Sequence, residues 1–157
     1  MTTTHDLHVV DTRPLIPPAL LHRDLPIDPK SLETVATARS RIQAILRGLD
    51  RRLLVIVGPC SVHDVEAARD YARRLAPLRE RHGAELEVVM RVYFEKPRTT
   101  VGWKGLINDP HLDGSYDINT GLQMARSLLL DLRREGMPSA TELLDPVAPQ
   151  YIAELIS

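Results

Sequence analysis

The sequence predicts an α/β protein in which helices alternate with the strands of a parallel sheet. Three segments have the composition of strands, at Leu53 to Val57, Leu86 to Phe94 and Ala140 to Asp145. Between them, apolar residues recur at three- and four-residue steps, which is typical of amphipathic helices. Strands that alternate with helices form a parallel sheet with right-handed crossovers, which allows a (β/α)8 barrel or an open doubly wound sheet. In both folds, ligands bind in the loops that follow the strands.

The first 30 residues carry five prolines, at positions 14, 17, 18, 26 and 29. Because proline disfavours regular structure, we expect only one short strand there, around Leu7 to Val10. We interpret this part as an extension that lies on the protein surface or on a partner subunit. The segment from Ser31 to Gly48 is predicted to be an amphipathic helix, with Ser31 as the N-cap and Gly48 as the residue after the C-cap.

The continuous apolar run from Leu53 to Val57 predicts a strand that is buried on both faces, as in the interior of a parallel sheet. Ser61 and Asp64 match a capping box, which predicts a helix that ends at Gly83. After the second strand, a long loop from residue 95 to about 116 leads to a helix with the candidate N-cap Asp117 and an end at Gly136. The last segment, residues 147–157, is interpreted as the start of a further helix.

The composition is that of a globular protein: 157 residues, 43% hydrophobic and 26% charged, with a formal charge of −1. No run approaches ~18 uninterrupted apolar residues, so we expect no membrane span and no membrane partner. The N-terminus lacks the basic and apolar regions of a signal peptide, which favours a cytoplasmic location. Lysine and arginine are spread along the chain, so we expect no nucleic-acid partner. Arginine pairs such as Arg51-Arg52 and Arg133-Arg134 are interpreted as solvated helix ends or faces.

The only cysteine, Cys60, follows the turn Gly58-Pro59 at the end of the first strand. A thiolate close to a helix N-terminus has a lowered pKa and can bind Zn, Fe, Mn or Co ions. The alternative is an inert buried cysteine, which is the commoner role of a lone cysteine. His63 could complete a Cys-x-x-His ligand pair, or it could hydrogen-bond locally or touch a substrate. A catalytic metal takes three or more protein ligands, so other ligands would have to come from elsewhere.

Arg91 interrupts an otherwise apolar strand, where a guanidinium is unfavourable unless an anion faces it. The partner could be Glu142 on the next strand. A substrate carboxylate or phosphate is favoured instead, because Lys96 and Arg98 follow in the adjoining loop and arginine suits bidentate contacts to oxyanions. These three cations within eight residues predict a site for phosphorylated substrates.

Pro97 sets the backbone between Lys96 and Arg98, so the two charges keep fixed relative directions, and Thr99 adds a hydroxyl donor. Trp103, further along the same loop, is either part of a lid or part of the core. The acidic loop at residues 108–113 does not have the spacing of an EF-hand, and we do not expect it to bind a metal.

The segments Gly58-Pro59-Cys60-Ser61 and Lys96-Pro97-Arg98-Thr99 closely resemble the class I 3-deoxy-D-arabino-heptulosonate-7-phosphate (DAHP) synthases, and the similarity runs from about residue 14 to the end. The resemblance implies a (β/α)8 TIM barrel that condenses phosphoenolpyruvate with erythrose 4-phosphate and releases phosphate. That reaction is the first step of the shikimate pathway to the aromatic amino acids. It also implies a homo-oligomer and inhibition by an aromatic amino acid.

The resemblance assigns roles to particular residues. Cys60 would bind a divalent metal ion, Mn, Fe, Co or Zn, and would be catalytic together with Lys96. The residues that would bind phosphoenolpyruvate are Arg91 and Lys96, and those around erythrose 4-phosphate are Lys96, Pro97, Arg98 and Thr99. Pro149 and Gln150 would lie near the regulatory pocket.

Two alternatives stay open, a second enzyme and a protein of a different class. A sister synthase of the 3-deoxy-octulosonate-8-phosphate type uses arabinose 5-phosphate and shares a similar Gly-Pro-Cys turn. Its later motif reads Lys-Ala-Asn-Arg-Ser, so Lys96-Pro97-Arg98-Thr99 favours erythrose 4-phosphate. The other alternative is a short non-catalytic module that binds a synthase or an effector.

The length sets the expected organisation. A (β/α)8 barrel takes ~250 residues, so a chain of 157 is expected to hold only roughly the first three β/α units and to be inactive alone. We expect residues 1–47 to form an extension with a helix for subunit or regulatory contacts, and residues 48–157 to form the first part of the barrel.

Overall fold

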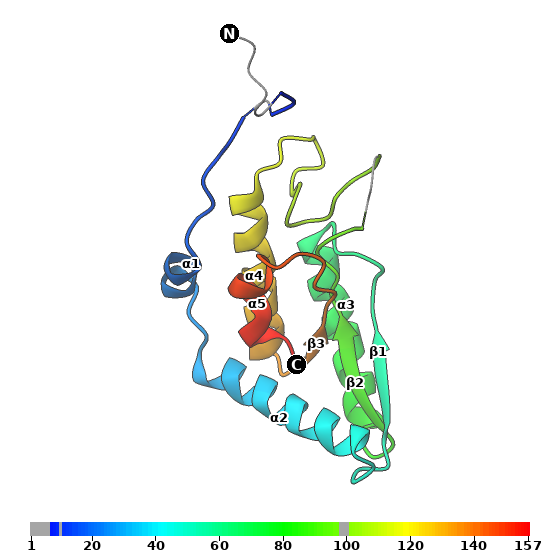
Figure 1. Cartoon of the computed structure of the whole chain (residues 1–157). Helices are drawn as coiled ribbons and strands as arrows, with labels where there is room; N and C mark the ends of the chain where they lie inside the picture. The colour runs from blue at the N-terminus through cyan, green and yellow to red at the C-terminus, as the bar shows by residue number, and fades with distance from the viewer. Residues whose placement is uncertain (1–6, 10, 98–100) are drawn as a thin grey trace.

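The computed structural model describes residues 7–9, 11–97 and 101–157 and contains helices that alternate with the strands of one sheet (Figure 1). The helices are α1 (Pro18–Asp24), α2 (Pro29–Leu46), α3 (Val65–Arg81), α4 (Ile118–Arg134), α5 (Pro149–Ile152) and the 3-10 helix η1 (Ala153–Leu155). The strands are β1 (Leu53–Val57), β2 (Leu86–Arg91) and β3 (Ser139–Ala140). They pair in parallel in the order β1-β2-β3. The predicted α/β class with a parallel sheet is therefore confirmed.

The central strand β2 is buried, whereas β1 is not. Val88, Val89 and Met90 are at most 5% exposed, but Leu53 of β1 is 65% exposed and Ile56 is 52% exposed. The expectation that β1 is buried on both faces is wrong here, because β1 is an edge strand of the described sheet and pairs only with β2.

Two helix starts differ from the prediction by the choice of capping residue. Asp28, and not Ser31, caps α2, since its Oδ1 accepts from the Ser31 backbone N–H at 2.9 Å. Asp64, and not Ser61, caps α3 by accepting from the backbone N–H groups of Glu66 and Ala67. In each case the cap is an aspartate, and its carboxylate accepts from backbone N–H groups two or three positions further along the chain.

Other helix ends follow the prediction. Asp117 caps α4 through a 3.3 Å hydrogen bond from Thr120 N. Gly48 and Gly136 lie just beyond the ends of α2 and α4 with φ of 71° and 75°, a left-handed conformation in which glycine has no steric cost.

The N-terminal part contains more regular structure than expected. Helix α1 forms within it, and Pro18 occupies the first helical turn, where a missing N–H leaves no hydrogen bond unmade. The strand expected around residues 7–10 is not seen at residues 7–9, which are exposed, and Val10 lies outside the described residues. Proline density alone was therefore a poor guide to this segment.

The third strand and the last helix are shorter than predicted. β3 pairs with β2 only at Ser139 and Ala140. Val92 N still donates to the Ala140 carbonyl at 2.8 Å, but the next carbonyl, that of Tyr93, accepts from Val62 N at 2.9 Å instead of pairing with the third strand. Residues 141–145 consequently have no ladder partner in β2, and the final helical segment is limited to α5 and η1.

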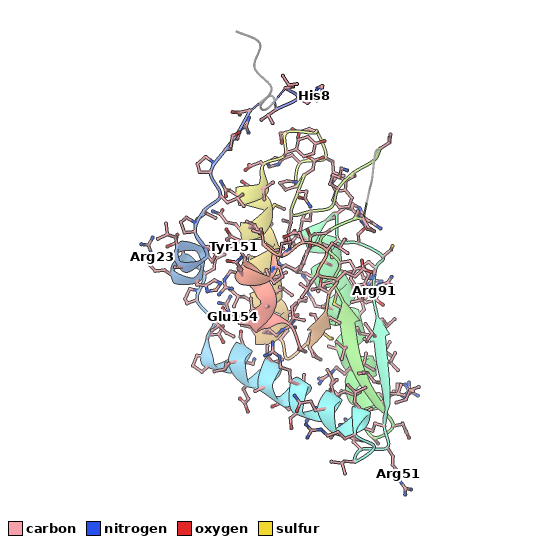
Figure 2. All side chains as sticks on the ribbon, in the orientation of Figure 1. His8, Arg23, Arg51, Arg91, Tyr151 and Glu154 are labelled. Atoms are coloured by element: carbon pink, nitrogen blue, oxygen red, sulfur yellow. The ribbon has the colours of Figure 1, made fainter. Side chains whose placement is uncertain are left out.

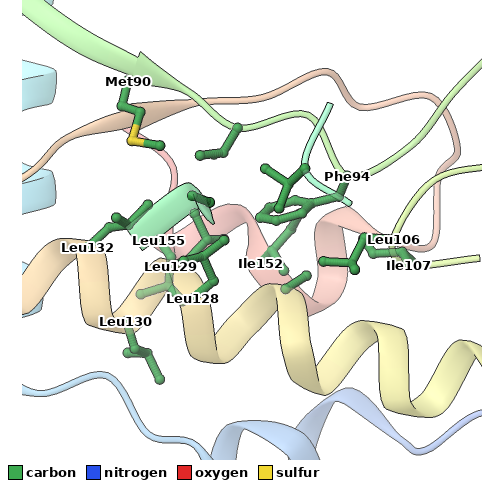
Figure 3. Close-up of a cluster of buried hydrophobic side chains, with 14 of the residues drawn as sticks. Met90, Phe94, Leu106, Ile107, Leu128, Leu129, Leu130, Leu132, Ile152 and Leu155 are labelled. Atoms are coloured by element: carbon green, nitrogen blue, oxygen red, sulfur yellow. The ribbon is translucent and has the colours of Figure 1, made fainter. Parts of the chain in front are cut away.

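The core lies between the sheet and the helices α3, α4 and α5 (Figure 3). Phe94 and Leu106, from the segments after β2, join the apolar side chains of α4 and of the last two helical turns in one cluster. The residues labelled in the figure are Met90, Phe94, Leu106, Ile107, Leu128, Leu129, Leu130, Leu132, Ile152 and Leu155. None of the helices within the described residues is long and apolar enough to cross a membrane.

Two arginines of α4 are fully buried and tie the surrounding segments together. Arg126 donates to the carbonyls of Leu25 and Tyr151, both at 2.7 Å, and Arg133 donates to the carbonyl of Leu155 at 2.7 Å. Burial lowers the pKa of Arg133 to about 9. The interpretation of Arg133 as a solvated helix end is therefore wrong. The carbonyls that accept from these arginines lie in segments distant in the sequence, which periodicity along one helix cannot show.

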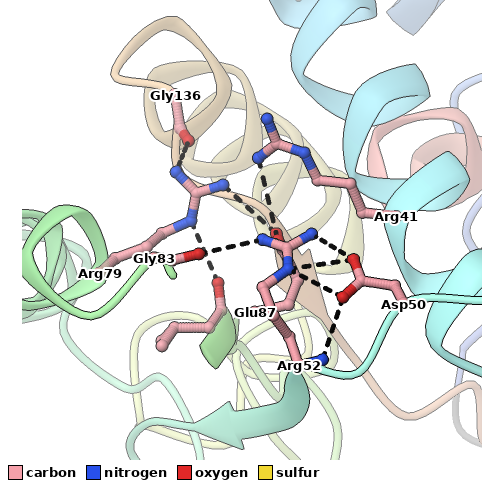
Figure 4. A network of polar contacts seen from close by, with 8 residues as sticks. Arg41, Asp50, Arg52, Arg79, Gly83, Glu87 and Gly136 are labelled. Atoms are coloured by element: carbon pink, nitrogen blue, oxygen red, sulfur yellow. Dashed lines mark hydrogen bonds and ion pairs between the residues drawn. The ribbon is translucent and has the colours of Figure 1, made fainter. Parts of the chain in front are cut away.

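A charged network lies at the amino end of the sheet (Figure 4). Glu87 is 2% exposed, and its carboxylate lies 2.7 Å from Arg52, 3.4 Å from Arg79 and 3.8 Å from Arg41. Arg41 comes from α2 and Arg79 from α3, so one carboxylate on β2 connects three segments.

We expect Glu87→Ala to lower the free energy of unfolding of the full-length protein by about 3–5 kcal/mol, because its arginine partners would lose a buried counter-charge. Chemical denaturation measures the loss. The exposed Glu80 on α3 supplies the control, since Glu80→Ala should change stability by less than about 0.5 kcal/mol. Equal, small effects of both substitutions would contradict the structural role of Glu87.

Candidate functional site

The turn after β1 brings Cys60 to the carboxyl end of the sheet. Gly58 approaches the neighbouring strand so closely that an added Cβ would lie 2.5 Å from the Arg91 carbonyl oxygen. Glycine is required by this close approach, because any side chain would push the two strands apart. The turn leaves the Cys60 side chain exposed, so the alternative of an inert buried cysteine does not hold.

Arg91 stabilises this turn from the end of β2 (Figure 2). Its Nε donates to the Pro59 carbonyl and its Nη2 to the Gly58 carbonyl, both at 3.1 Å. The guanidinium also lies 5.1 Å from the centre of the Tyr93 ring. Neither Glu142 nor any other carboxylate within residues 7–9, 11–97 and 101–157 forms an ion pair with Arg91. The partners of Arg91 are backbone carbonyls, which sequence reasoning missed. They occupy only some of the guanidinium N–H groups, and the remaining N–H groups can bind an anion.

Lys96 and Cys60 are in direct contact. The Lys96 Nζ lies 3.1 Å from the Cys60 Sγ, although the residues are 36 positions apart. The hydrogen bond and the charge of Lys96 lower the pKa of the Cys60 thiol, Arg91 contributes in the same direction, and Glu142 opposes it. The predicted loops after β1 and β2 therefore do meet, and they place a thiol that ionises readily beside two cations.

The loop that carries Lys96 is supported from behind by residues 103–109. The Lys96 backbone N–H donates to the Lys104 carbonyl at 2.9 Å, and Trp103 Nε1 donates to the Asp109 carbonyl at 2.7 Å. Trp103 is half-buried and packs against the hydrophobic core, which favours the core interpretation over a lid. Pro97 is exposed, while Arg98 and Thr99 lie outside the described residues.

Cys60 is the candidate metal ligand that the sequence predicted within the described ranges. Cys60, with its lowered pKa, has the donor chemistry of a ligand for a borderline or soft divalent metal ion. His63 is exposed in the turn before α3, and no three His, Cys, Asp or Glu residues in the described part of the chain gather into a metal site. In the acidic loop, both Asp109 carboxylate oxygens accept from Gly114 N, so they stabilise the loop itself.

An acidic side chain that sequence reasoning missed, Glu95, lies directly before Lys96. Glu95 is only 6% exposed. Its burial is the main cause, and its hydrogen bond with Asp145 the second cause, of a pKa that is raised to about 7. The sequence offered one signal, a glutamate between the apolar Phe94 and a lysine, but nothing in it indicated Asp145, which is 50 positions away.

The raised pKa predicts a pH dependence of stability. The unfolded chain releases the Glu95 proton near the ordinary value of 4.5, whereas the folded protein keeps it until about pH 7. Between those values the folded state binds more protons, so the free energy of unfolding falls as pH rises. The stability that protonated Glu95 contributes is fully present below the pKa of the unfolded chain, 4.5. It is lost as the pH rises through the pKa of the folded protein, about 7. Thermal melts of the full-length protein and of Glu95→Gln should diverge across this window. Parallel pH profiles would contradict the shift.

Pro149 and Gln150, the predicted regulatory residues, lie in α5, where Pro149 is half-buried and Gln150 is exposed. The next residue, Tyr151, donates from its hydroxyl to the Ile16 carbonyl at 2.6 Å. The N-terminal segment therefore packs against the helix that carries both residues, as Figure 2 shows for Tyr151.

A readily ionised thiol, a lysine and an arginine at the carboxyl ends of parallel strands define a candidate enzyme site for anionic substrates in an α/β fold. Comparison with known proteins identifies the family. The DAHP synthetase I family model matches residues 24–157, and the chain belongs to this family.

Individual relatives support the same family assignment. The chain is 57% identical over 152 residues to the Phe-sensitive phospho-2-dehydro-3-deoxyheptonate aldolase of Escherichia coli K12, covering 97% of this chain and 43% of the relative. It is 60% identical over 144 residues to an aldolase of the same name from Amycolatopsis methanolica, covering 92% and 71%. The solved structure of the Francisella tularensis aldolase superposes with a TM-score of 0.92 at 51% identity, covering 94% and 43%. The chain thus matches part of a TIM-barrel enzyme and spans less than half the length of most of these relatives.

Proposed function

We propose that the full-length protein containing this chain is a 3-deoxy-7-phosphoheptulonate synthase. It would condense phosphoenolpyruvate with erythrose 4-phosphate to give DAHP and phosphate. The observation that carries the proposal is the contact of Lys96 Nζ with Cys60 Sγ, beside Arg91, in a member of the DAHP synthetase I family. Residues 1–47 would serve as the extension and residues 48–157 as the first part of the barrel.

The roles of the residues follow from their chemistry. Cys60 would hold a divalent metal ion as thiolate, and such an ion supplies Lewis-acid polarisation of a carbonyl oxygen. Arg91 and Lys96 would bind the carboxylate and phosphate of phosphoenolpyruvate. Arg91 is suited to this because the Gly58 and Pro59 carbonyls fix its guanidinium before any ligand arrives, which reduces the entropy lost on binding.

Lys96 would have two partners in turn. Its ammonium contacts the Cys60 Sγ in the free protein, and it would turn to the substrate anion when Cys60 binds a metal. Lys96, Pro97, Arg98 and Thr99 together would form the binding segment for erythrose 4-phosphate.

We expect Arg98→Ala to raise the KM for erythrose 4-phosphate at least about tenfold, and to raise the KM for phosphoenolpyruvate much less, since one charge-assisted hydrogen bond contributes about 1.5–3 kcal/mol. Steady-state kinetics with each substrate varied in turn measures both constants. Equal increases in the two KM values would assign Arg98 to general electrostatics instead.

Regulation by an aromatic amino acid is part of the proposal. Relatives are named Phe-sensitive in Escherichia coli and Trp-sensitive in Enterobacter agglomerans. We propose that a homo-oligomer of the full-length protein binds such an inhibitor near Pro149 and Gln150. The packing of the N-terminal segment on Tyr151 supports a regulatory role for this region.

The test is phosphate release by the full-length protein from phosphoenolpyruvate with erythrose 4-phosphate, in the presence of Mn²⁺. Arabinose 5-phosphate in place of erythrose 4-phosphate is the matched control. Release with erythrose 4-phosphate only is the expected result. Release with arabinose 5-phosphate only would indicate the sister synthase, and no release with either sugar would favour a non-catalytic module.

A further inference from the structure

The guanidinium of Arg91 is held along one of its edges. Nε donates to the Pro59 carbonyl and Nη2 to the Gly58 carbonyl, both at 3.1 Å. These two nitrogens form the side edge of the guanidinium, so its end edge keeps Nη1 and the second N–H of Nη2. Parallel N–H groups on one edge match the oxygens of a carboxylate or a phosphate. The turn carbonyls thus leave Arg91 an edge that suits an oxyanion.

Hydrogen bonds along one edge fix that edge but not the tilt of the whole group. The guanidinium can still turn about the line through Nε and Nη2, and this rotation would swing the end edge away from a bound ligand. Tyr93 contacts the face of the group, since the Arg91 Cζ lies over its ring, 5.1 Å from the ring centre. Cations are attracted to an aromatic face, and arginine also stacks on it. The ring therefore opposes the tilt that the carbonyls leave free.

The position of the Tyr93 ring is set by its backbone. Val92 is 0% exposed, whereas Arg91 and Tyr93 on either side of it are half-buried, which is the alternation of extended backbone. Arg91 and Tyr93 therefore lie on the same side of the chain. The Val92 N–H donates to the Ala140 carbonyl at 2.8 Å, and the Tyr93 carbonyl accepts from Val62 N at 2.9 Å. The backbone that carries the ring is thus anchored to β3 and to the turn after β1.

We propose that Tyr93 is a positioning residue for Arg91: its ring fixes the plane of the guanidinium and so directs the free edge at a substrate carboxylate or phosphate. An aromatic side chain has little rotamer freedom, whereas an arginine side chain has much, so an anchored ring can order the guanidinium at little entropic cost of its own. The consequence for phosphoenolpyruvate rests on the proposed function, in which Arg91 binds this substrate. The orientation of the guanidinium in the free protein does not.

Tyr93→Leu and Tyr93→Phe in the full-length protein test the role of the ring, because leucine removes the aromatic face and phenylalanine keeps it. In Tyr93→Leu, the KM for phosphoenolpyruvate should rise about fivefold or more, as expected for a partly buried cation–π contact. The kcat and the KM for erythrose 4-phosphate should change less than about twofold, since the lost interaction concerns the binding of one substrate. Tyr93→Phe should keep the KM for phosphoenolpyruvate within about twofold of the wild-type value. Tyr93→Met is a second replacement without a ring, for use if Tyr93→Leu does not fold.

A double-mutant cycle shows whether the ring acts through Arg91. Arg91→Gln removes the guanidinium, so adding Tyr93→Leu in that background should lower kcat/KM for phosphoenolpyruvate by less than about twofold more. Tyr71 supplies the matched control, because it is a partly buried tyrosine of α3 that packs against the hydrophobic core. Tyr71→Leu should leave the KM for phosphoenolpyruvate unchanged.

Crystal structures of the ligand-free full-length variants give a result that does not depend on activity. In Tyr93→Leu, the Arg91 guanidinium should tilt out of its wild-type plane or occupy more than one orientation, and in Tyr93→Phe it should keep that plane. An unchanged guanidinium in Tyr93→Leu would overturn the proposal. Equal rises in KM for Tyr93→Leu and Tyr93→Phe, or an undiminished effect of Tyr93→Leu in the Arg91→Gln background, would also overturn it.

The two proposals can fail separately. A wild-type protein without synthase activity would refute the proposed function, and the orientation of the guanidinium in Tyr93→Leu would then decide whether Tyr93 positions Arg91. An active wild type whose KM for phosphoenolpyruvate is unaffected by Tyr93→Leu would leave the proposed function intact and refute the role of Tyr93.

Discussion

Replacing Cys60 with alanine in the full-length protein is expected to abolish metal-dependent turnover, with kcat lowered at least about 1,000-fold. A loss of several kcal/mol of Lewis-acid stabilisation corresponds to about three powers of ten in rate. The structure supports the choice of residue, because Cys60 is exposed at the end of β1 and its thiol has a lowered pKa. Metal content measured by atomic emission, together with turnover in added Mn²⁺, tests the ligand role.

The matched control for Cys60→Ala is Glu80→Ala, on the exposed surface of α3 and remote from the carboxyl end of the sheet. It should bind metal and turn over as the wild type does. If Cys60→Ala kept both its metal and its turnover, the ligand role of Cys60 would have to be abandoned.

Lys96→Met should lower kcat/KM for phosphoenolpyruvate at least about 100-fold, because a hydrogen-bonded charge that is removed from an anion site costs about 2–5 kcal/mol. Methionine keeps much of the length of the side chain but has no charge. The same substitution removes the main cause of the lowered Cys60 pKa, so alkylation of the metal-free protein should shift to higher pH.

Lys96→Arg is the informative comparison, since it keeps the charge but presents a planar group of different shape. We expect the pH dependence of Cys60 alkylation to be partly restored and kcat/KM to remain low. If Lys96→Met left both the alkylation profile and kcat/KM unchanged, Lys96 would have neither of its two proposed roles.

Local chemistry explains which parts of the fold could be predicted. The periodicity of α4, its N-cap Asp117 and the glycine at position 136 are all set within one stretch of sequence, and each was predicted correctly. The burial of β1 was not predicted correctly, because burial depends on which strands lie beside β1 and not on its own apolar composition.

The same distinction applies to the candidate site. The glycine turn before Cys60 and the cations after β2 were visible as motifs, and the parallel sheet brings them together. The carbonyl partners of Arg91 and the pairing of Glu95 with Asp145 were not visible, because each joins groups from different loops. Carbonyl oxygens are present at every residue, so no sequence pattern marks the ones that an arginine will use.

The most direct test is a crystal structure of the full-length protein with Zn²⁺ and phosphoenolpyruvate, the metal being located by anomalous scattering. We predict the Cys60 Sγ at about 2.3 Å from the metal, with Lys96 and Arg91 in contact with phosphoenolpyruvate. A metal bound away from Cys60, with Lys96 still on the thiol and no ligand at Arg91, would contradict the proposed site.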